Sequence, residues 1–144
     1  MNEIQNLWAD FRLPIRDALY FVNGDSYDVT LASDTPGGWK VLAPFDVSDM
    51  LAREPDWTSE IDGLISMELG QGGFLWGGDG SYGSEGFFGR LAPDRSLVWA
   101  VFFMESNPFE DIQLFGEIAT FTSTNGSEVT VDINDPRNPI PGNG

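Results

Sequence analysis

The chain has 144 residues, of which 23 are Asp or Glu and only 7 are Lys or Arg, so its formal net charge at pH 7 is −16. It contains no histidine and no cysteine. These counts exclude Ser-His-Asp and Cys-His catalytic units, zinc sites built from His and Cys, and disulfides. They also predict no nucleic-acid or membrane partner, because phosphate backbones and anionic lipid surfaces carry charge of the same sign.

The composition predicts a folded protein and not a disordered acidic chain. Hydrophobic residues make up 41% of the sequence, including 11 Phe and 5 Trp, which is enough for a core in a chain of this length. We expect residues 1–133 to form one domain and residues 134–144, which are rich in Pro and Asn, to be an extended or disordered tail. We expect a cytoplasmic location, because residues 1–6 lack the basic start and apolar stretch of a signal peptide.

The first part of the chain predicts a short helix followed by three strands. Apolar residues recur at helical spacing from Ile4 to Phe11. Two apolar runs, 18–22 and 27–32, flank a turn-forming cluster and predict a hairpin. A third strand is expected at 39–43, after a turn that contains Pro and two Gly residues.

A second helix is predicted to begin after Asp46. The Asp46 side chain can cap the free backbone amides of the first turn, with Asp49 at the position of a capping-box partner. The helix should end by Glu54, because Pro55 follows it. We expect one further helical turn within residues 56–62.

From residue 64 onward the pattern indicates an antiparallel sheet. Strands are expected at 64–69, 87–91 and 97–104, and in a final hairpin of 112–121 and 127–133. The run 97–104 is apolar on both faces, so it should be a central strand that is covered on both sides. The predicted fold class is therefore α+β: a mostly antiparallel curved sheet with one or two short helices packed on one face.

The most unusual segment is Gly70–Gly89, in which nine of twenty residues are glycine. Aromatic side chains lie among these glycines: Phe74, Trp76, Tyr82, Phe87 and Phe88. One interpretation is a binding loop whose aromatic side chains contact a partner. The other is a structural hairpin whose aromatic side chains reach back into the core. The sequence leaves both open.

Residues 78–83 match the G-x-G-x-x-G pattern of dinucleotide-binding proteins. No helical pattern follows them, although that mechanism needs a helix N-terminus aimed at the pyrophosphate. Asp79 and Glu85 would also repel the pyrophosphate. We therefore predict no dinucleotide site, and we expect no other cofactor or metal, because the acidic residues do not fit the spacing of a calcium-binding loop.

Candidate partner-binding residues come from the glycine-rich segment and from the acidic cluster after the run 97–104. They are Trp76, Asp79, Tyr82, Glu85, Glu105, Glu110 and Asp111. Acidic side chains attract basic protein surfaces and speed their association. Buried Trp and Tyr side chains contribute much of the binding energy at such interfaces.

A small acidic chain without histidine or cysteine resembles the bacterial immunity proteins that neutralise secreted toxins. The segment Leu97–Phe109, LVWAVFFMESNPF, also resembles a recurring piece of bacterial proteins of this size. This resemblance implies a cognate toxin, often a basic nuclease, a deaminase or another nucleotide-targeting enzyme, whose active site is occluded. It carries no catalytic motif over to this chain.

Two functions from different classes fit the sequence. The favoured one is an acidic binding module without enzymatic activity, because it uses the dominant feature of the chain, its charge. The alternative is a small carboxylate-dependent hydrolase or ligand-binding protein that uses acids such as Glu105 and Glu110. The identity of the toxin, the binding face and the oligomeric state are not determined by the sequence.

Overall fold

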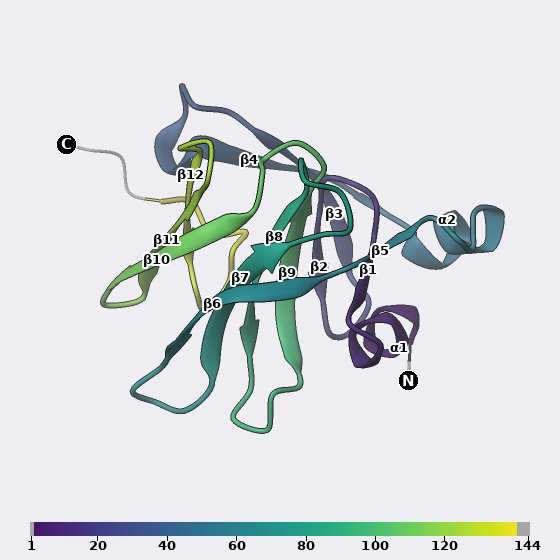
Figure 1. Ribbon diagram of the computed structural model, residues 1–144, viewed down its shortest axis with the longest axis horizontal. Coiled ribbons are helices and arrows are strands. Elements are labelled where there is room, and N and C mark those ends of the chain that lie inside the picture. The colour runs from purple at the N-terminus through teal and green to yellow at the C-terminus, as the bar shows by residue number, and fades with distance from the viewer. Residues whose placement is uncertain (1, 141–144) are drawn as a thin grey trace.

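A computed structural model describes residues 2–140 of the chain (Figure 1). Within this range lie two short helices, α1 (Glu3–Ala9) and α2 (Val47–Arg53), and one 3-10 turn, η1 (Pro36–Gly38). The strands of the same range are β1 (Arg12–Pro14), β2 (Ala18–Phe21), β3 (Ser26–Leu31), β4 (Trp39–Phe45), β5 (Thr58–Glu60), β6 (Asp62–Glu68), β7 (Phe74–Asp79), β8 (Gly86–Leu91), β9 (Leu97–Phe103), β10 (Phe109–Phe115), β11 (Ile118–Ser123) and β12 (Glu128–Asp132).

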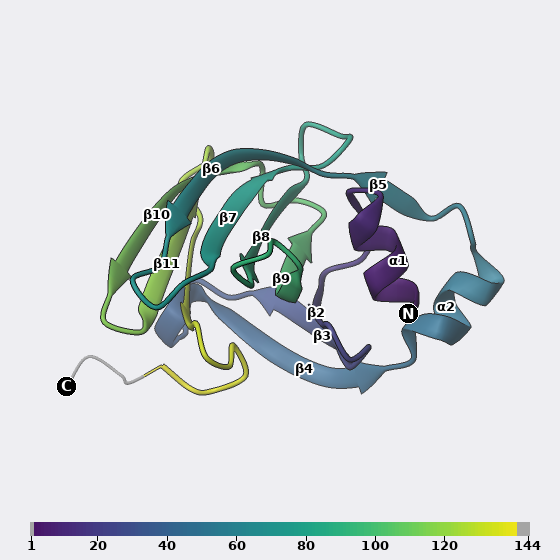
Figure 2. The same ribbon diagram turned by 90° about the horizontal axis from the view of Figure 1, so that it is seen from below.

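The described strands form a seven-stranded sheet of order β4-β3-β2-β9-β8-β7-β6, a three-stranded sheet β10-β11-β12 and a short β1-β5 pair, all antiparallel. The large sheet curves so that β10 packs beside β6 (Figure 2), and β12 packs beside η1. The three-stranded sheet therefore covers one face of the large sheet, and both helices lie on the other side. The predicted α+β class, with a curved antiparallel sheet and short helices, is confirmed.

Strand β9 is the middle strand of the seven, and both of its faces are buried. Trp99, Val101 and Phe103 belong to the core beneath the three-stranded sheet. Ala100 and Phe102 belong to the second core, beneath the helices. Because side chains alternate across a strand, only a run that is apolar at every position satisfies two cores at once. The predicted central strand is confirmed.

The main core is built around Phe88 of β8. Its ring stacks on Phe121 of β11, with centroids 4.1 Å apart and an interplanar angle of 11°. The edge of Phe109 meets the same ring at 5.0 Å. Offset stacked and edge-on aromatic pairs add attraction beyond the area that they bury. These contacts join the two sheets.

The two helices begin at side-chain caps that their sequences encode. Asn2 accepts a hydrogen bond from the Gln5 N–H and donates its own N–H to the Gln5 side chain, which forms a capping box. Asp46 accepts a hydrogen bond from the Asp49 N–H at 3.1 Å, as predicted. Helix α1 buries Trp8, together with Ile4, in the second core.

Two local predictions are wrong, and one open alternative is decided. Residues 56–62 contain strand β5 where a helical turn is predicted, because pairing with β1 satisfies their backbone groups. In the glycine-rich segment, β7 and the start of β8 form an antiparallel hairpin whose aromatic side chains, apart from Tyr82, pack against the two cores, as the structural-hairpin interpretation predicts. The predicted strand 112–121 is two strands, β10 and β11, because the chain turns at Gly116, whose φ is +60°.

Residues 134–140 run back over β2 and β3. The Arg137 guanidinium pairs with Asp135 at 2.8 Å and lies 4.6 Å from the centre of the Phe21 ring. It also donates a hydrogen bond to the Tyr27 hydroxyl at 3.0 Å. The remainder of the predicted tail, residues 141–144, lies outside the described residues. No helix among residues 2–140 has the length and hydrophobicity needed to cross a membrane.

Candidate functional site

A cleft of about 610 Å³ opens where β7 ends and β6 begins, beside the turn that follows α1. Its lining combines aromatic and acidic side chains: Phe11, Glu60, Ile61, Asp62, Trp76, Asp79, Gly80 and Ser81. Two of the predicted site residues, Trp76 and Asp79, are brought together here. Phe11, Glu60 and Asp62 lie far from them in the chain and were not predicted as site residues.

Trp76 forms the aromatic wall of the cleft. Strand alternation places Leu75 in the main core and Trp76 against the second core. The Trp76 ring meets Trp8 edge-on at 5.7 Å and Phe87 at 5.1 Å. It also covers the backbone of Gly63, where a Cβ atom would overlap the indole nitrogen. The position of the indole therefore depends on a glycine on the neighbouring strand.

Phe11 holds a second ring at the rim of the cleft, in a backbone conformation that phenylalanine rarely adopts. Its φ is +54°, in the left-handed region where a helix usually ends with glycine. The Phe11 side chain is 58% exposed and meets the Trp76 ring edge-on at 6.5 Å. This conformation costs about 1–2 kcal/mol for a residue with a Cβ atom. A bulky aromatic ring is thus kept exposed beside the cleft at the expense of stability.

The acidic side of the cleft is built by strand register. Asp62 and Asp79 are direct partners in the β6–β7 ladder. Burial raises the pKa of the Asp79 carboxyl, and the charge of Asp62 raises it further. Glu60 pairs with Arg12 at 3.2 Å, but no basic side chain lines the cleft. Within residues 2–140, no three acidic groups are placed to hold a metal ion.

The like-charged pair predicts that Asp79→Asn stabilises the fold at neutral pH. When the pKa of an acid is higher in the folded than in the unfolded state, the protein becomes less stable as the pH rises from the unfolded-state pKa through the folded-state pKa. We expect the free energy of unfolding at pH 7 to increase by about 0.2–1 kcal/mol, the size of a cross-strand charge pair. The gain should vanish at a pH below the ordinary range of Asp, where both carboxyls are protonated.

Urea unfolding of both proteins at the two pH values measures this effect. The matched control is Asp94→Asn in an exposed turn, where hydrogen bonds from Ser96 lower the pKa of the Asp94 carboxyl. The control should lose stability at pH 7, in the opposite direction. A loss of stability in Asp79→Asn at pH 7 would contradict the repulsion between Asp62 and Asp79.

The turn between β7 and β8 is held by the carboxylate of Glu85. This side chain is only 2% exposed and accepts hydrogen bonds from the Ser59 hydroxyl at 2.6 Å and the Tyr82 N–H at 3.2 Å. The Ser59 oxygen in turn accepts from the Ser81 N–H at 2.8 Å. Glu85 therefore positions the turn against β5 and cannot present its carboxylate to a partner. The partner contact predicted for Glu85 is corrected to this structural role.

Tyr82 and Glu105 lie at the same end of the large sheet as the cleft. Tyr82 is 65% exposed in the turn after β7. Glu105 is exposed in the turn after β9. This turn contacts the β7–β8 turn through a hydrogen bond from the Asn107 N–H to the Ser84 carbonyl at 2.8 Å. Both side chains are therefore exposed at the end of the sheet that carries the cleft.

Asp17 extends the acidic surface at this end. Burial raises the pKa of the Asp17 carboxyl and Glu105 adds to the rise, although a hydrogen bond from the Met104 N–H opposes it. Glu110 and Asp111 lie instead at the start of β10, in the sheet that packs on the other face of β7. The structure therefore separates these two predicted residues from the cleft.

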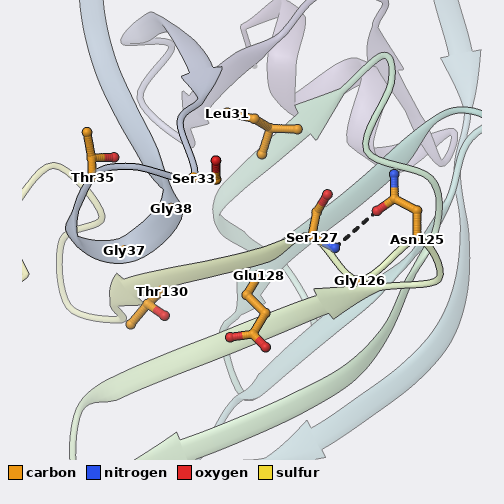
Figure 3. A pocket seen from close by; sticks show the side chains of 10 residues that line it. All are labelled: Leu31, Ser33, Thr35, Gly37, Gly38, Asn125, Gly126, Ser127, Glu128 and Thr130. Carbon is orange, nitrogen blue, oxygen red and sulfur yellow. Dashed lines mark hydrogen bonds between the residues drawn. The ribbon is translucent and has the colours of Figure 1, made fainter.

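A second hollow, of about 490 Å³, lies between η1 and the β11–β12 turn (Figure 3). Its lining contains one charged side chain, Glu128, and no aromatic ring. The backbone of η1 packs so closely here that a Cβ atom at Gly38 would overlap the Glu128 carbonyl. Figure 3 shows the polar turn at its other side, where Ser127 N–H donates to Asn125. We interpret this hollow as the junction where the three-stranded sheet packs against η1 of the curved large sheet.

Comparison with known proteins adds no relative: no family model, no curated protein and no solved structure matches the chain. The cleft joins two aromatic rings with three acids and lies in an acidic end of the molecule.

Proposed function

We propose that this protein is a binding module that docks on the basic surface of a partner protein through the end of the large sheet that carries the cleft. The observation that carries the proposal is the lining of the cleft. Rings of Phe11 and Trp76 lie beside the acids Asp62 and Asp79, and no basic side chain lines the same surface. Aromatic anchors beside uncompensated acids suit a cationic partner surface.

The charge of the whole chain supports the same proposal. A net charge of −16 creates a field that draws in basic proteins and raises association rates by roughly 10–10³-fold. Glu105 and Asp17 widen the acidic surface around the cleft, and Tyr82 adds an exposed aromatic ring at the same end of the sheet. Such a surface provides attraction over a broad area, and the cleft provides a local anchor.

The partner class that we propose is a secreted toxin, which this protein neutralises as immunity proteins do. The carboxylates at the cleft end would occupy the positions where a basic toxin active site holds substrate phosphates. The rings of Trp76 and Phe11 would be buried against the toxin. Inhibition of this kind is steric and electrostatic, and it needs no catalytic group on this chain. A cytoplasmic location fits this role.

The alternative function, a carboxylate-dependent hydrolase, has one supporting observation. Burial raises the pKa of Asp79, which lines the same cleft as Trp76, and a general acid in glycoside hydrolysis needs a raised pKa near a sugar-binding aromatic. Glu105 and Glu110, which the sequence offers for this role, lie on different elements, after β9 and on β10. The binding module is the better proposal because it uses the aromatic rings, the acids and the overall charge together.

The product of the reading frame next to the gene provides the test. We expect it to be a basic toxin whose growth inhibition is relieved by this protein. Stopped-flow measurements should show an association rate constant that falls about tenfold or more from low to high salt, whereas the dissociation rate constant changes little. The substitution Glu105→Lys should slow association further. An association rate that does not depend on ionic strength would overturn the proposal.

A further inference from the structure

The arginines of this chain show a recurring arrangement with aromatic rings and aspartates. The Arg16 guanidinium pairs with Asp28 at 2.8 Å, and its central carbon lies 3.7 Å from the centre of the Phe45 ring. Arg137 repeats this arrangement with Asp135 and Phe21, as described above. In both places a flat cation lies over a ring while a carboxylate holds its edge.

The cleft supplies the ring and the carboxylates of this arrangement without the cation. Its rings are those of Trp76 and Phe11, and Trp is the best side chain for contact with a cation. Its carboxylates include the cross-strand partners Asp62 and Asp79. The raised pKa of Asp79 supports this, because an unpaired, partly buried acid gains from a nearby positive charge.

No arginine of the described chain lines the cleft, although Arg12 pairs with Glu60, one of the lining acids. Besides Arg16 and Arg137, the arginines contact the following groups: Arg12 the Glu60 carboxylate, Arg53 the Asp49 carboxylate, Arg90 the Ile133 carbonyl, and Arg95 the Phe74 ring. Lys40, the one lysine of the sequence, lies on β4, at the opposite edge of the large sheet from β6. Because all seven Lys and Arg residues lie within residues 2–140 and none of them lines the cleft, a lysine or arginine side chain that fills it would come from another molecule.

We infer that the cleft is a receptor for an arginine side chain of the partner protein. The inference rests on the proposed function and names the group that the partner inserts. Arginine fits better than lysine, because a planar guanidinium can lie against a ring and bond two carboxylate oxygens at once, whereas an ammonium is a strongly hydrated point charge. The volume of about 610 Å³ falls within the roughly 300–1,000 Å³ of ligand-binding clefts.

Titration with short peptides tests this inference on the intact protein. The probes are an oligo-arginine peptide, an oligo-lysine peptide and an uncharged oligo-citrulline peptide of the same length. We expect the arginine peptide to bind about tenfold more tightly than the lysine peptide, and the citrulline peptide not to bind. In ¹H–¹⁵N spectra, the indole signal of Trp76, assigned with the Trp76→Phe variant, should shift during the arginine titration.

Variants of the cleft separate an anchored arginine from general charge attraction. Phe11→Asn removes a ring and introduces asparagine, which tolerates the left-handed backbone conformation of position 11, so the fold should be retained. Asp79→Asn removes one carboxylate. Each should weaken binding of the arginine peptide about fivefold or more. The matched control is Glu117→Gln, which removes one charge in the exposed β10–β11 turn and should leave the affinity almost unchanged.

The possible outcomes distinguish the inference from the proposed function. Equal affinity for the arginine and lysine peptides, with the same small loss in Asp79→Asn and Glu117→Gln, would overturn the arginine receptor and leave the acidic binding module intact. Failure of both cationic peptides to bind at low salt would overturn the proposed function as well. Selective binding of arginine that is lost in Phe11→Asn and Asp79→Asn would support the inference.

Discussion

Replacing Phe88 with alanine should lower the free energy of unfolding by about 3–5 kcal/mol, the usual cost of removing a buried aromatic ring. Phe88 is fully buried, stacks on Phe121 at 4.1 Å and meets the edge of Phe109 at 5.0 Å. Both partners belong to the three-stranded sheet. The substitution therefore leaves a cavity between the two sheets at the place where they are joined.

Urea unfolding followed by tryptophan fluorescence measures this loss. The matched control is Phe115→Ala at the end of β10, because Phe115 is 79% exposed and its loss should change stability by less than about 0.5 kcal/mol. A loss below about 1 kcal/mol in Phe88→Ala would mean that the two sheets do not pack through this ring.

Replacing Gly63 with alanine should displace Trp76 and disable the cleft. A Cβ atom at position 63 would overlap the indole nitrogen, and the indole is confined on its other sides by Trp8 and Phe87. Because the ring cannot move freely, we expect a cost of about 1–3 kcal/mol in stability. We also expect a loss of at least about tenfold in affinity for a basic partner, as for removal of a central Trp contact.

Gly83→Ala is the matched control for Gly63→Ala. Position 83 lies in the turn between β7 and β8, and nothing stands within 4 Å of an added Cβ atom. This variant should keep both stability and binding. Calorimetric unfolding and a binding titration measure the two effects in each variant. Unchanged affinity in a folded Gly63→Ala protein, with the indole signal of Trp76 shifted, would remove Trp76 from the binding surface.

Elements with a strong local signal are predictable from this sequence. Asp46 and the later Pro55 bound α2 correctly, because a cap and a proline act on the backbone next to them. The apolar run 97–104 correctly predicts a central strand, because a strand that is covered on both faces buries apolar side chains at successive positions. The alternation of Val129 and Val131 with polar residues likewise marks the buried face of β12.

Elements that are stabilised by residues far away in the sequence cannot be predicted from local patterns. Strand β5 has three residues, and only its pairing with β1 distinguishes it from a turn. Strand β7 contains glycines at positions 77 and 78, which local propensity disfavours in a strand. The β6 backbone and Phe109 lie so close to these positions that larger side chains would not fit easily. The composition that suggested a loop is thus required by close packing between strands.

The candidate site was predicted only in part. Trp76 and Asp79 are predicted site residues because they are an aromatic and an acid in a glycine-rich segment, and both line the cleft. Phe11 and Asp62 were missed, since no local pattern relates them to Trp76. Glu85 has the same local features as Asp79, yet hydrogen bonds from the β5 side turn its carboxylate inward.

Net charge and the absence of histidine and cysteine are properties of the whole composition. The periodicity of apolar residues depends only on positions close together in the sequence. The sequence by itself therefore determines that this protein is acidic, that it forms a curved antiparallel sheet with short helices, and which reactive side chains it lacks. Only the tertiary structure places Asp62 opposite Asp79 and the Phe11 ring beside Trp76. Strand register and the direction of the chain after α1 decide these contacts, and both depend on packing between residues far apart in the sequence.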